Sequence, residues 1–218
     1  MTITQKNPTK TTNANKTFVG IDYSMTSPAI AIYRGDPKDF HWKKVEFHYY
    51  TPITALAKDW ERSGQTWCRG YGSLTIHANN EERFLRLATW TLATVVGKLG
   101  ELVPDPKNVY TALEDYALGG KGRVFEIAEN TGCLKQILRA AEYQFDLIPP
   151  TVVKKFATGK GNSKKEQMYD AWMKETKFDI WKIMTPGRGK VSSPVTDIVD
   201  AYYLLKIAID NHTKEQTK

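Results

Sequence analysis

Cysteine is scarce in this chain, which has two of them, Cys68 and Cys133, among 218 residues. Two cysteines so far apart form neither a metal-binding cluster nor a disulfide framework, and we expect both to be reduced thiols of an intracellular protein. Long apolar runs are missing too, since no stretch approaches the roughly 20 residues that cross a bilayer. No secretory signal opens the chain. We therefore expect a cytoplasmic protein with no membrane partner.

Positive charge, by contrast, is in excess. Lys and Arg number 31 against 24 Asp and Glu, which gives a formal net charge of +7 and a pI near 9.2. This balance favours an anionic partner, above all nucleic acid. Residues 1–16 are mostly Thr, Asn, Lys and Gln and predict a disordered polar tail, and residues 211–218 predict a second one. The remaining residues, 17–210, are enough for a single domain with a sizeable core.

Five stretches have the apolar character of strands, and five others have the three-and-four spacing of helices. The expected strands cover residues 17–24, 29–33, 45–50, 109–116 and 145–148, and the expected helices cover residues 80–98, 124–143, 151–158, 163–174 and 193–209. Three consecutive strands followed by helix-separated strands predict an α/β fold, a mixed five-stranded sheet with helices on both faces. Ser163 and Glu166 predict a capping box, and Ser193 and Pro194 predict the start of the last helix.

Residues 51–80 interrupt this order with aromatic and basic side chains that follow no clear period. They include Trp60, Arg62, Trp67, Arg69 and Tyr71. Aromatic rings interleaved with arginines can stack on bases or line a phosphate path. They can equally form a small satellite core. The sequence leaves both interpretations of this insertion open.

Two carboxylates lie one turn apart in the last expected helix. Asp197 and Asp200 share one side of a helix that is otherwise largely apolar. First-turn acids that complement the helix dipole are common, so this pair alone does not establish a site. Two further acids close expected strands, Asp22 the first and Glu114 the fourth. If both strands are central and parallel, Asp22 and Glu114 would be near neighbours at one edge of the sheet.

Four such carboxylates form the ligand set of a two-metal site. They can hold two Mg²⁺ ions roughly 4 Å apart, one activating water and the other stabilising the departing oxygen of a phosphodiester. Hard oxygen ligands select Mg²⁺ or Mn²⁺ over Zn²⁺. The sequence has no cluster of Cys and His ligands, which agrees with this choice.

Basic residues gather in three glycine-containing loops and in the helices beside the second loop. The candidate DNA contacts are Lys121, Arg123, Lys154, Lys155, Lys160, Lys164, Lys165, Arg188 and Lys190. Lys164 and Lys165 lie in an expected first helical turn, where they oppose the macrodipole, and contact with phosphate would explain them. A solvated lysine face is the alternative. The loop around Lys121 lacks the spacing of a nucleotide P-loop, so no nucleotide cofactor is expected.

Four segments together resemble the RuvC family of Holliday-junction resolvases, which has an RNase H-like, retroviral-integrase-like fold. They are Val19-Gly20-Ile21-Asp22, Ala112-Leu113-Glu114, Val153 to Gln167, and Asp197-Ile198-Val199-Asp200-Ala201, in the family's order. The third segment is similar to the family's "VK…TG.G…K.Q" pattern and puts its two functional lysines at Lys154 and Lys165. The matches cover roughly residues 17–34 and 108–210.

The resemblance implies a Mg²⁺-dependent crossover junction endodeoxyribonuclease. It implies a homodimer, joined through the helix 124–143, that binds four-way or branched DNA. Paired symmetric nicks would leave 5′-phosphate and 3′-hydroxyl ends. The implied metal ligands and catalytic acids are Asp22, Glu114, Asp197 and Asp200. Lys165, also catalytic, and Lys154 would contact or orient the scissile strand.

The chain departs from the family at the aromatic wedge, which often follows the catalytic Glu by three residues. Ala117 occupies that position here, and Tyr116 lies one residue earlier. Opening of the junction, and contact with DNA there, would then use Tyr116, Phe125 or an aromatic residue of the insertion. The insertion and the tail rich in Lys, Asn and Thr suggest a bacteriophage enzyme.

Two other functions remain open in the sequence. The same fold could cut flaps, replication forks or RNA–DNA hybrids, because backbone contacts dominate affinity and shape decides selectivity. An actin-like or sugar-kinase-like ATPase is the remote alternative, because Gly20-Ile21-Asp22 followed by Ser24 resembles the first phosphate loop of that superfamily. Against it, the chain is too short for two such domains and has no second phosphate loop.

Overall fold

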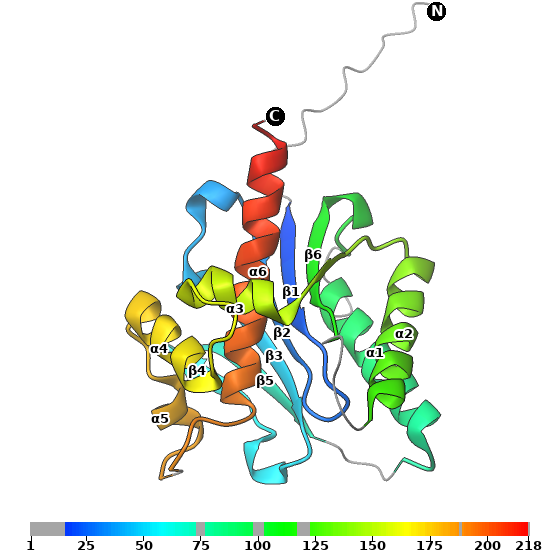
Figure 1. Cartoon of the computed structure of the whole chain (residues 1–218), viewed down its shortest axis with the longest axis horizontal. Helices are drawn as coiled ribbons and strands as arrows, with labels where there is room; N and C mark the ends of the chain where they lie inside the picture. The colour runs from blue at the N-terminus through cyan, green and yellow to red at the C-terminus, as the bar shows by residue number, and fades with distance from the viewer. Residues whose placement is uncertain (1–15, 73–76, 98–102, 117–122, 188, 218) are drawn as a thin grey trace, which may run out of the picture.

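A mixed sheet forms the centre of the molecule, and helices pack on both of its faces (Figure 1). The computed structural model describes residues 16–72, 77–97, 103–116, 123–187 and 189–217. In these residues the sheet has seven strands in the order β4-β5-β3-β2-β1-β6-β7. The strands are β1 (Thr17–Asp22), β2 (Ala29–Arg34), β3 (Glu46–Thr51), β4 (Trp60–Arg62), β5 (Gln65–Gly72), β6 (Val109–Glu114) and β7 (Asp146–Ile148).

The helices divide between the two faces of the sheet. They are α1 (Asn80–Val96), α2 (Val124–Ala140), α3 (Pro150–Thr158), α4 (Lys165–Thr176), α5 (Ile180–Met184) and α6 (Val195–Glu215). One hydrophobic core joins α3, α4, α5 and α6 to one face, and a second core joins α1 and α2 to the other. The long helix α6 crosses the sheet over β1 and β2 (Figure 1). No described helix is both long enough and apolar enough to span a membrane.

The inner strand β1 is buried along its whole length. It pairs antiparallel with β2 and parallel with β6, and β6 pairs parallel with β7. Its residues are mostly apolar rather than alternating, as expected of a strand that is covered on both faces. All the strands expected from the sequence form and pair in a mixed sheet between two layers of helices, which confirms the predicted fold class.

The predicted number of five strands is wrong, because the insertion adds β4 and β5 to the sheet. β5 pairs in parallel with β3, and β4 folds back on β5 through Ser63 and Gly64, which both have positive φ. With only three residues, β4 is too short to display a period in the sequence. Trp67 is 5% exposed, and its ring meets that of Phe47 edge-on, with 6.1 Å between centroids. The insertion thus extends the main core and forms no separate satellite core among the described residues.

The start of α4 differs from the prediction by one residue. Lys164 is the N-cap of this helix, and its backbone amide donates a hydrogen bond to the Gln167 side chain at 2.9 Å. The Ser163 hydroxyl instead lies 2.6 Å from the hydroxyl of Thr158, at the end of the preceding helix. The predicted capping box of Ser163 and Glu166 is therefore wrong. The Ser163 side chain joins two helices rather than capping one.

The start of α6 is also capped differently. Its N-cap is Pro194, and the first helical residue is Val195. The Ser193 hydroxyl, expected at the N-cap, donates a hydrogen bond to the carboxylate of Asp197. Ser193, which was predicted to cap the helix, thus fixes the carboxylate of Asp197 in its first turn.

The end of α6 lies within residues 211–218, which were expected to form a polar tail. The helix continues to Glu215. His212 is 5% exposed, and its ring centroid lies 3.9 Å from that of Tyr110. This contact packs the last turns of α6 against the sheet.

Candidate active site

Asp22 and Glu114 close two neighbouring parallel strands, β1 and β6, which are paired in register. Side chains alternate between the faces of a strand. Gly20 and Ala112, two residues before each acid, face the core that contains α6, so both acids point toward that side. Asp22 is 9% exposed. The fold therefore brings together the two strand-end acids that the sequence singled out.

The backbone of α6 lies directly on β1 because Gly20 has no side chain to hold them apart. A Cβ atom at Gly20 would stand 2.2 Å from the carbonyl oxygen of Ala201 and 2.2 Å from the backbone nitrogen of Leu205. This close approach brings Asp197 and Asp200 to the end of β1. Sequence reasoning did not give Gly20 this role, although a glycine inside a buried strand is a signal of close backbone approach.

Asp197 is held by three neighbouring side chains. It is 6% exposed and accepts hydrogen bonds from the hydroxyls of Ser193 and Thr196, the latter at 3.0 Å. The Lys165 ammonium, at the start of α4, lies 3.8 Å from an Asp197 carboxylate oxygen and 3.3 Å from the Thr196 hydroxyl. The Lys165 side chain is 61% exposed, so the same ammonium can also meet a bound ligand.

Burial and mutual repulsion act together on the acids. Burial raises the pKa of Asp22 well above its usual range, and the charges of the other three acids raise it further. Burial also raises the pKa of Asp200 to about 7, with a further rise from Glu114 and an opposing effect of Lys165. Burial raises the pKa of Glu114 as well, while a hydrogen bond with Asp22 and the charge of Lys154 lower it in part. Such a cluster favours either protons or a neutralising cation.

The chemistry of the cluster suits a hard divalent cation. We call Asp22, Glu114, Asp197 and Asp200 the four carboxylates. They supply only oxygen donors, which Mg²⁺ prefers, and a cation among them would relieve their repulsion. Among the described residues, no three His, Cys, Asp or Glu side chains are already arranged as ligands of one ion. By its chemistry alone, the donor set fits a hard divalent cation.

The structure separates the predicted DNA contacts into groups. Lys154 and Lys165 lie close enough to the four carboxylates to lower the pKa of Glu114 and Asp200. Lys155, Lys160, Lys164 and Lys190 are exposed at the surface, as Lys165 is. Arg123 instead forms an ion pair with Glu126 at 3.1 Å at the start of α2.

Lys121, Arg188 and Ala117 lie outside the described residues. Of the two aromatic residues considered for the junction, Tyr116 has the Lys135 ammonium 5.3 Å from its ring centroid. Phe125 is 84% exposed. Tyr116 is thus half-buried, whereas Phe125 points largely into solvent.

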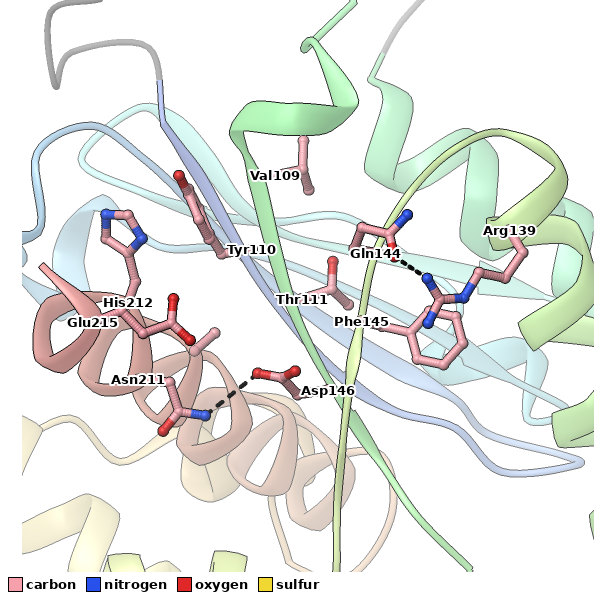
Figure 2. A pocket seen from close by; sticks show the side chains of 11 residues that line it. Val109, Tyr110, Thr111, Arg139, Gln144, Phe145, Asp146, Asn211, His212 and Glu215 are labelled. Atoms are coloured by element: carbon pink, nitrogen blue, oxygen red, sulfur yellow. Dashed lines mark hydrogen bonds between the residues drawn. The ribbon is translucent and has the colours of Figure 1, made fainter.

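Another pocket, of about 280 Å³, lies where β6, β7 and the end of α6 meet (Figure 2). Each of two charged side chains in it is paired with a neutral amide: Asn211 donates to Asp146 at 3.4 Å, and Arg139 donates to Gln144. None of the four carboxylates lines it. We therefore place the candidate active site at the opposite end of β6, where Glu114 is.

No protein-family profile and no curated protein sequence matches this chain. Solved structures do match it. RuvC of Thermus thermophilus is 12% identical, with a TM-score of 0.52 over 91% of this chain and 96% of that one. The same RuvC in complex with a Holliday junction substrate is 14% identical, with a TM-score of 0.53 and the same coverage.

The chain has a RuvC-like fold. This likeness agrees with the predicted RNase H-like class, which the order of β3, β2, β1, β6 and β7 with α6 across them also supports. At 12–14% identity the likeness concerns the fold alone, so any activity of this chain depends on its own four carboxylates and the basic residues around them.

Proposed function

We propose that this chain is a metal-dependent, structure-selective endonuclease that resolves four-way DNA junctions. The observation that carries the proposal is the meeting of the four carboxylates at one edge of the sheet, with Lys165 beside them. The RuvC-like fold supports it, because the RuvC structure with which this chain aligns holds a Holliday junction substrate. The net charge of +7 suits a polyanionic partner.

The four carboxylates would hold the metal, Mg²⁺ with Mn²⁺ as a substitute, and two ions per site as the family resemblance implies. Bound there, the metal would supply an activated water and stabilise the oxygen that departs from phosphorus. Cleavage of the 3′ oxygen–phosphorus bond by water would leave a 5′-phosphate and a 3′-hydroxyl. These ends can be ligated, as resolution of a junction requires.

The side chains around the metal ligands would position the acids and the DNA. Ser193 and Thr196 donate to Asp197 and fix its carboxylate, while the buried face of α6 keeps that helix on the sheet. Lys165, held by Asp197 and largely exposed, would donate to a phosphate oxygen of the scissile strand. Lys154 would add a second positive charge close to the same acids.

The exposed basic residues would bind the arms of the junction. The proposed contacts are Lys155, Lys160, Lys164 and Lys190, with Arg123 at the start of α2 and with Lys121 and Arg188, which lie outside the described residues. Phosphate contacts of this kind fix orientation without reading sequence. Selectivity would then depend on the shape of the DNA.

Paired nicks require two active sites on one junction, so we propose a homodimer. The helix α2 is the proposed contact, because Phe125 near its start is 84% exposed. Ile127 on the same helix is 37% exposed, so α2 presents more than one large apolar side chain to solvent. Sedimentation of the purified chain at several concentrations would measure the dimer directly.

The test of this function compares four substrates. We expect the purified chain in Mg²⁺ to cut a synthetic four-way junction at symmetric positions, and to cut a flap, an RNA–DNA hybrid and a linear duplex far more slowly. EDTA should abolish the cut. If the chain cut the hybrid or the flap faster than the junction, that nucleic acid would be its substrate instead of the junction. No cleavage of any of them in Mg²⁺ or Mn²⁺ would contradict the proposal.

A further inference from the structure

The loop between α3 and α4 connects the two lysines that lie beside the four carboxylates. Lys154 is in α3, four residues before the end of that helix at Thr158, and Lys165 is the first residue of α4. Both helices pack against α6, which carries Asp197 and Asp200. The path of this loop therefore decides where the Lys165 ammonium lies relative to Lys154 and to the acids.

Side-chain hydroxyls tie the two ends of this loop together. The hydroxyl oxygen of Thr158 lies 2.6 Å from that of Ser163, and the Ser163 hydroxyl lies 2.9 Å from the carbonyl oxygen of Lys160. The Lys160 amide donates to the Thr158 hydroxyl oxygen at 3.2 Å. We call Thr158 and Ser163 the hydroxyl pair.

The hydroxyl pair also reaches back to the turn of α3 that carries Lys154. The Thr158 hydroxyl donates to the Lys154 carbonyl oxygen at 2.8 Å. Its oxygen can then accept from the Ser163 hydroxyl and from the Lys160 amide, so these three hydrogen bonds form at once. The pair thus connects the backbone of Lys154 to the residue that stands two positions before Lys165.

The loop is packed closely against α3. Ser163 is 3% exposed, and a buried hydroxyl is unfavourable unless it is hydrogen-bonded, as this one is. A Cβ atom at Gly161 would stand 3.1 Å from the carbonyl oxygen of Thr151, in the first turn of α3. These contacts leave the loop little freedom and hold α3 and α4 in one relative position.

Lys165 needs such support because few contacts hold its side chain. The ammonium lies 3.3 Å from the Thr196 hydroxyl and 3.8 Å from an Asp197 carboxylate oxygen, while the side chain is 61% exposed. A long, flexible lysine side chain follows any shift of the backbone that carries it. A displacement of roughly 1 Å at a reacting group can lower a rate about a hundredfold.

We propose that Thr158 and Ser163 are positioning residues for cleavage, which act through Lys165. This role rests on the proposed function and deepens it, because it names the contact that places the Lys165 ammonium at the carboxylates. The hydroxyl pair itself would touch neither DNA nor metal. Without it the start of α4 would shift, so the chemical step would slow while the exposed lysines would still bind the junction.

The test removes each hydroxyl and keeps the rest of the site. Thr158→Val deletes one hydroxyl with little change of shape, Ser163→Ala deletes the other, and Thr158→Ser keeps the hydroxyl. The matched control is Thr213→Val, because the Thr213 hydroxyl also donates to the carbonyl oxygen four residues earlier at 2.8 Å, but near the end of α6. Each variant is assayed by single-turnover cleavage of a four-way junction with saturating protein, by junction binding in EDTA and by thermal melting.

Thr158→Val and Ser163→Ala should each lower the single-turnover rate constant on the order of tenfold, part of the roughly hundredfold loss expected for Lys165→Met. The junction Kd should stay within about twofold of wild type, because the exposed lysines are unchanged. Thr158→Ser should restore most of the rate, and Thr213→Val should match wild type.

The deciding measurement adds Thr158→Val to Lys165→Met. Since the hydroxyl acts through Lys165, the double variant should cleave at nearly the rate of Lys165→Met alone. A defect in the fold would instead lower the rate by the same factor whether or not Lys165 is present.

Two results would overturn the inference. One is a wild-type rate constant for both Thr158→Val and Ser163→Ala, even at a lower Tm, because the hydroxyl pair would then serve the fold alone. The other is a double variant in which the two losses multiply. Absence of cleavage by wild type would instead refute the proposed function itself, so the two failures are distinguishable.

Discussion

Gly20 and Ala201 lie in direct backbone contact, since a Cβ atom on Gly20 would stand 2.2 Å from the Ala201 carbonyl oxygen. The contact joins β1 to α6, and each of these elements carries members of the four carboxylates. It therefore sets the distance between the strand that ends in Asp22 and the helix that begins near Asp197 and Asp200. The geometry of the site thus depends on Gly20, a residue that has no reactive side chain.

Gly20→Ala should destabilise the fold and reduce cleavage together. The added methyl must push α6 away from β1, and overpacking of this kind costs about 1–3 kcal/mol or more. Urea denaturation measures the loss of unfolding free energy. Gly132→Ala is the matched control, because nothing lies within 4 Å of a Cβ atom there and alanine favours the helix α2. If Gly20→Ala is as stable and as active as Gly132→Ala, the close contact is not needed.

Lys165→Met should slow cleavage much more than it weakens binding of the junction. The ammonium lies 3.8 Å from Asp197, where it would stabilise charge on the scissile phosphate, and loss of one such donor lowers kcat by roughly a hundredfold. Lys174→Met changes an exposed lysine at the other end of α4 and should leave kcat within about twofold. Single-turnover cleavage measures the rate constant of each variant. Equal rates for the two variants would remove Lys165 from the site.

Mg²⁺ should stabilise the folded chain, because a cation relieves the repulsion among the four carboxylates. With Mg²⁺ about tenfold above its Kd, we expect a rise in Tm of about 3–6 °C over that in EDTA. In EDTA, Asp200→Asn should melt higher than wild type, since it removes one of the repelling charges. It should also respond less to Mg²⁺. A melting curve unchanged by millimolar Mg²⁺ or Mn²⁺ would contradict a metal site there.

Glu46 should contribute stability that depends on pH. A hydrogen bond with His48, supported by the charges of His48, Arg34 and Arg69 against the effect of burial, lowers the pKa of Glu46 from 4.5 to about 2. A lowered carboxyl pKa stabilises the fold above the unfolded value, and the contribution is lost as the pH falls through the folded value.

The measurement compares Tm of wild type and Glu46→Gln as the pH decreases. Wild type should melt at a higher temperature than Glu46→Gln at neutral pH. The difference in Tm between them should decrease between pH 4.5 and pH 2. Glu129→Gln, an exposed carboxylate of α2, should show a small gap throughout. A difference in Tm for Glu46→Gln that stays constant over this range would show that the charge of Glu46 contributes no pH-dependent stability.

The sequence predicted the parts of this fold that depend on local pattern. The apolar residues around Asp22 identify a buried strand, and the spacing of Ile198, Ala201 and Leu205 identifies the inward face of α6. The four carboxylates followed from their positions at the ends of these elements. Their role as metal ligands stays a prediction that the experiments above address.

Other features depend on contacts between distant residues and could not be read locally. The hydroxyl of Thr196 acquires its role from Lys165, which is 31 residues away in the chain. Ser163 looks like a cap, but the end of α3 supplies a competing partner in Thr158. The insertion showed no period because β4 is short, and Trp67 turned inward to join the main core.

Two aspartates of α6 test the metal site when their variants are compared in cleavage of a four-way junction. Asp200 faces the other acids, whereas Asp210 forms an ion pair with Lys214 at 2.5 Å farther along the helix. Asp200→Asn should bind the junction normally and cut it at least about a hundredfold more slowly in Mg²⁺, while Asp210→Asn should cut at the wild-type rate. Cleavage by Asp200→Asn at a rate near that of wild type would contradict a metal site formed by the four carboxylates.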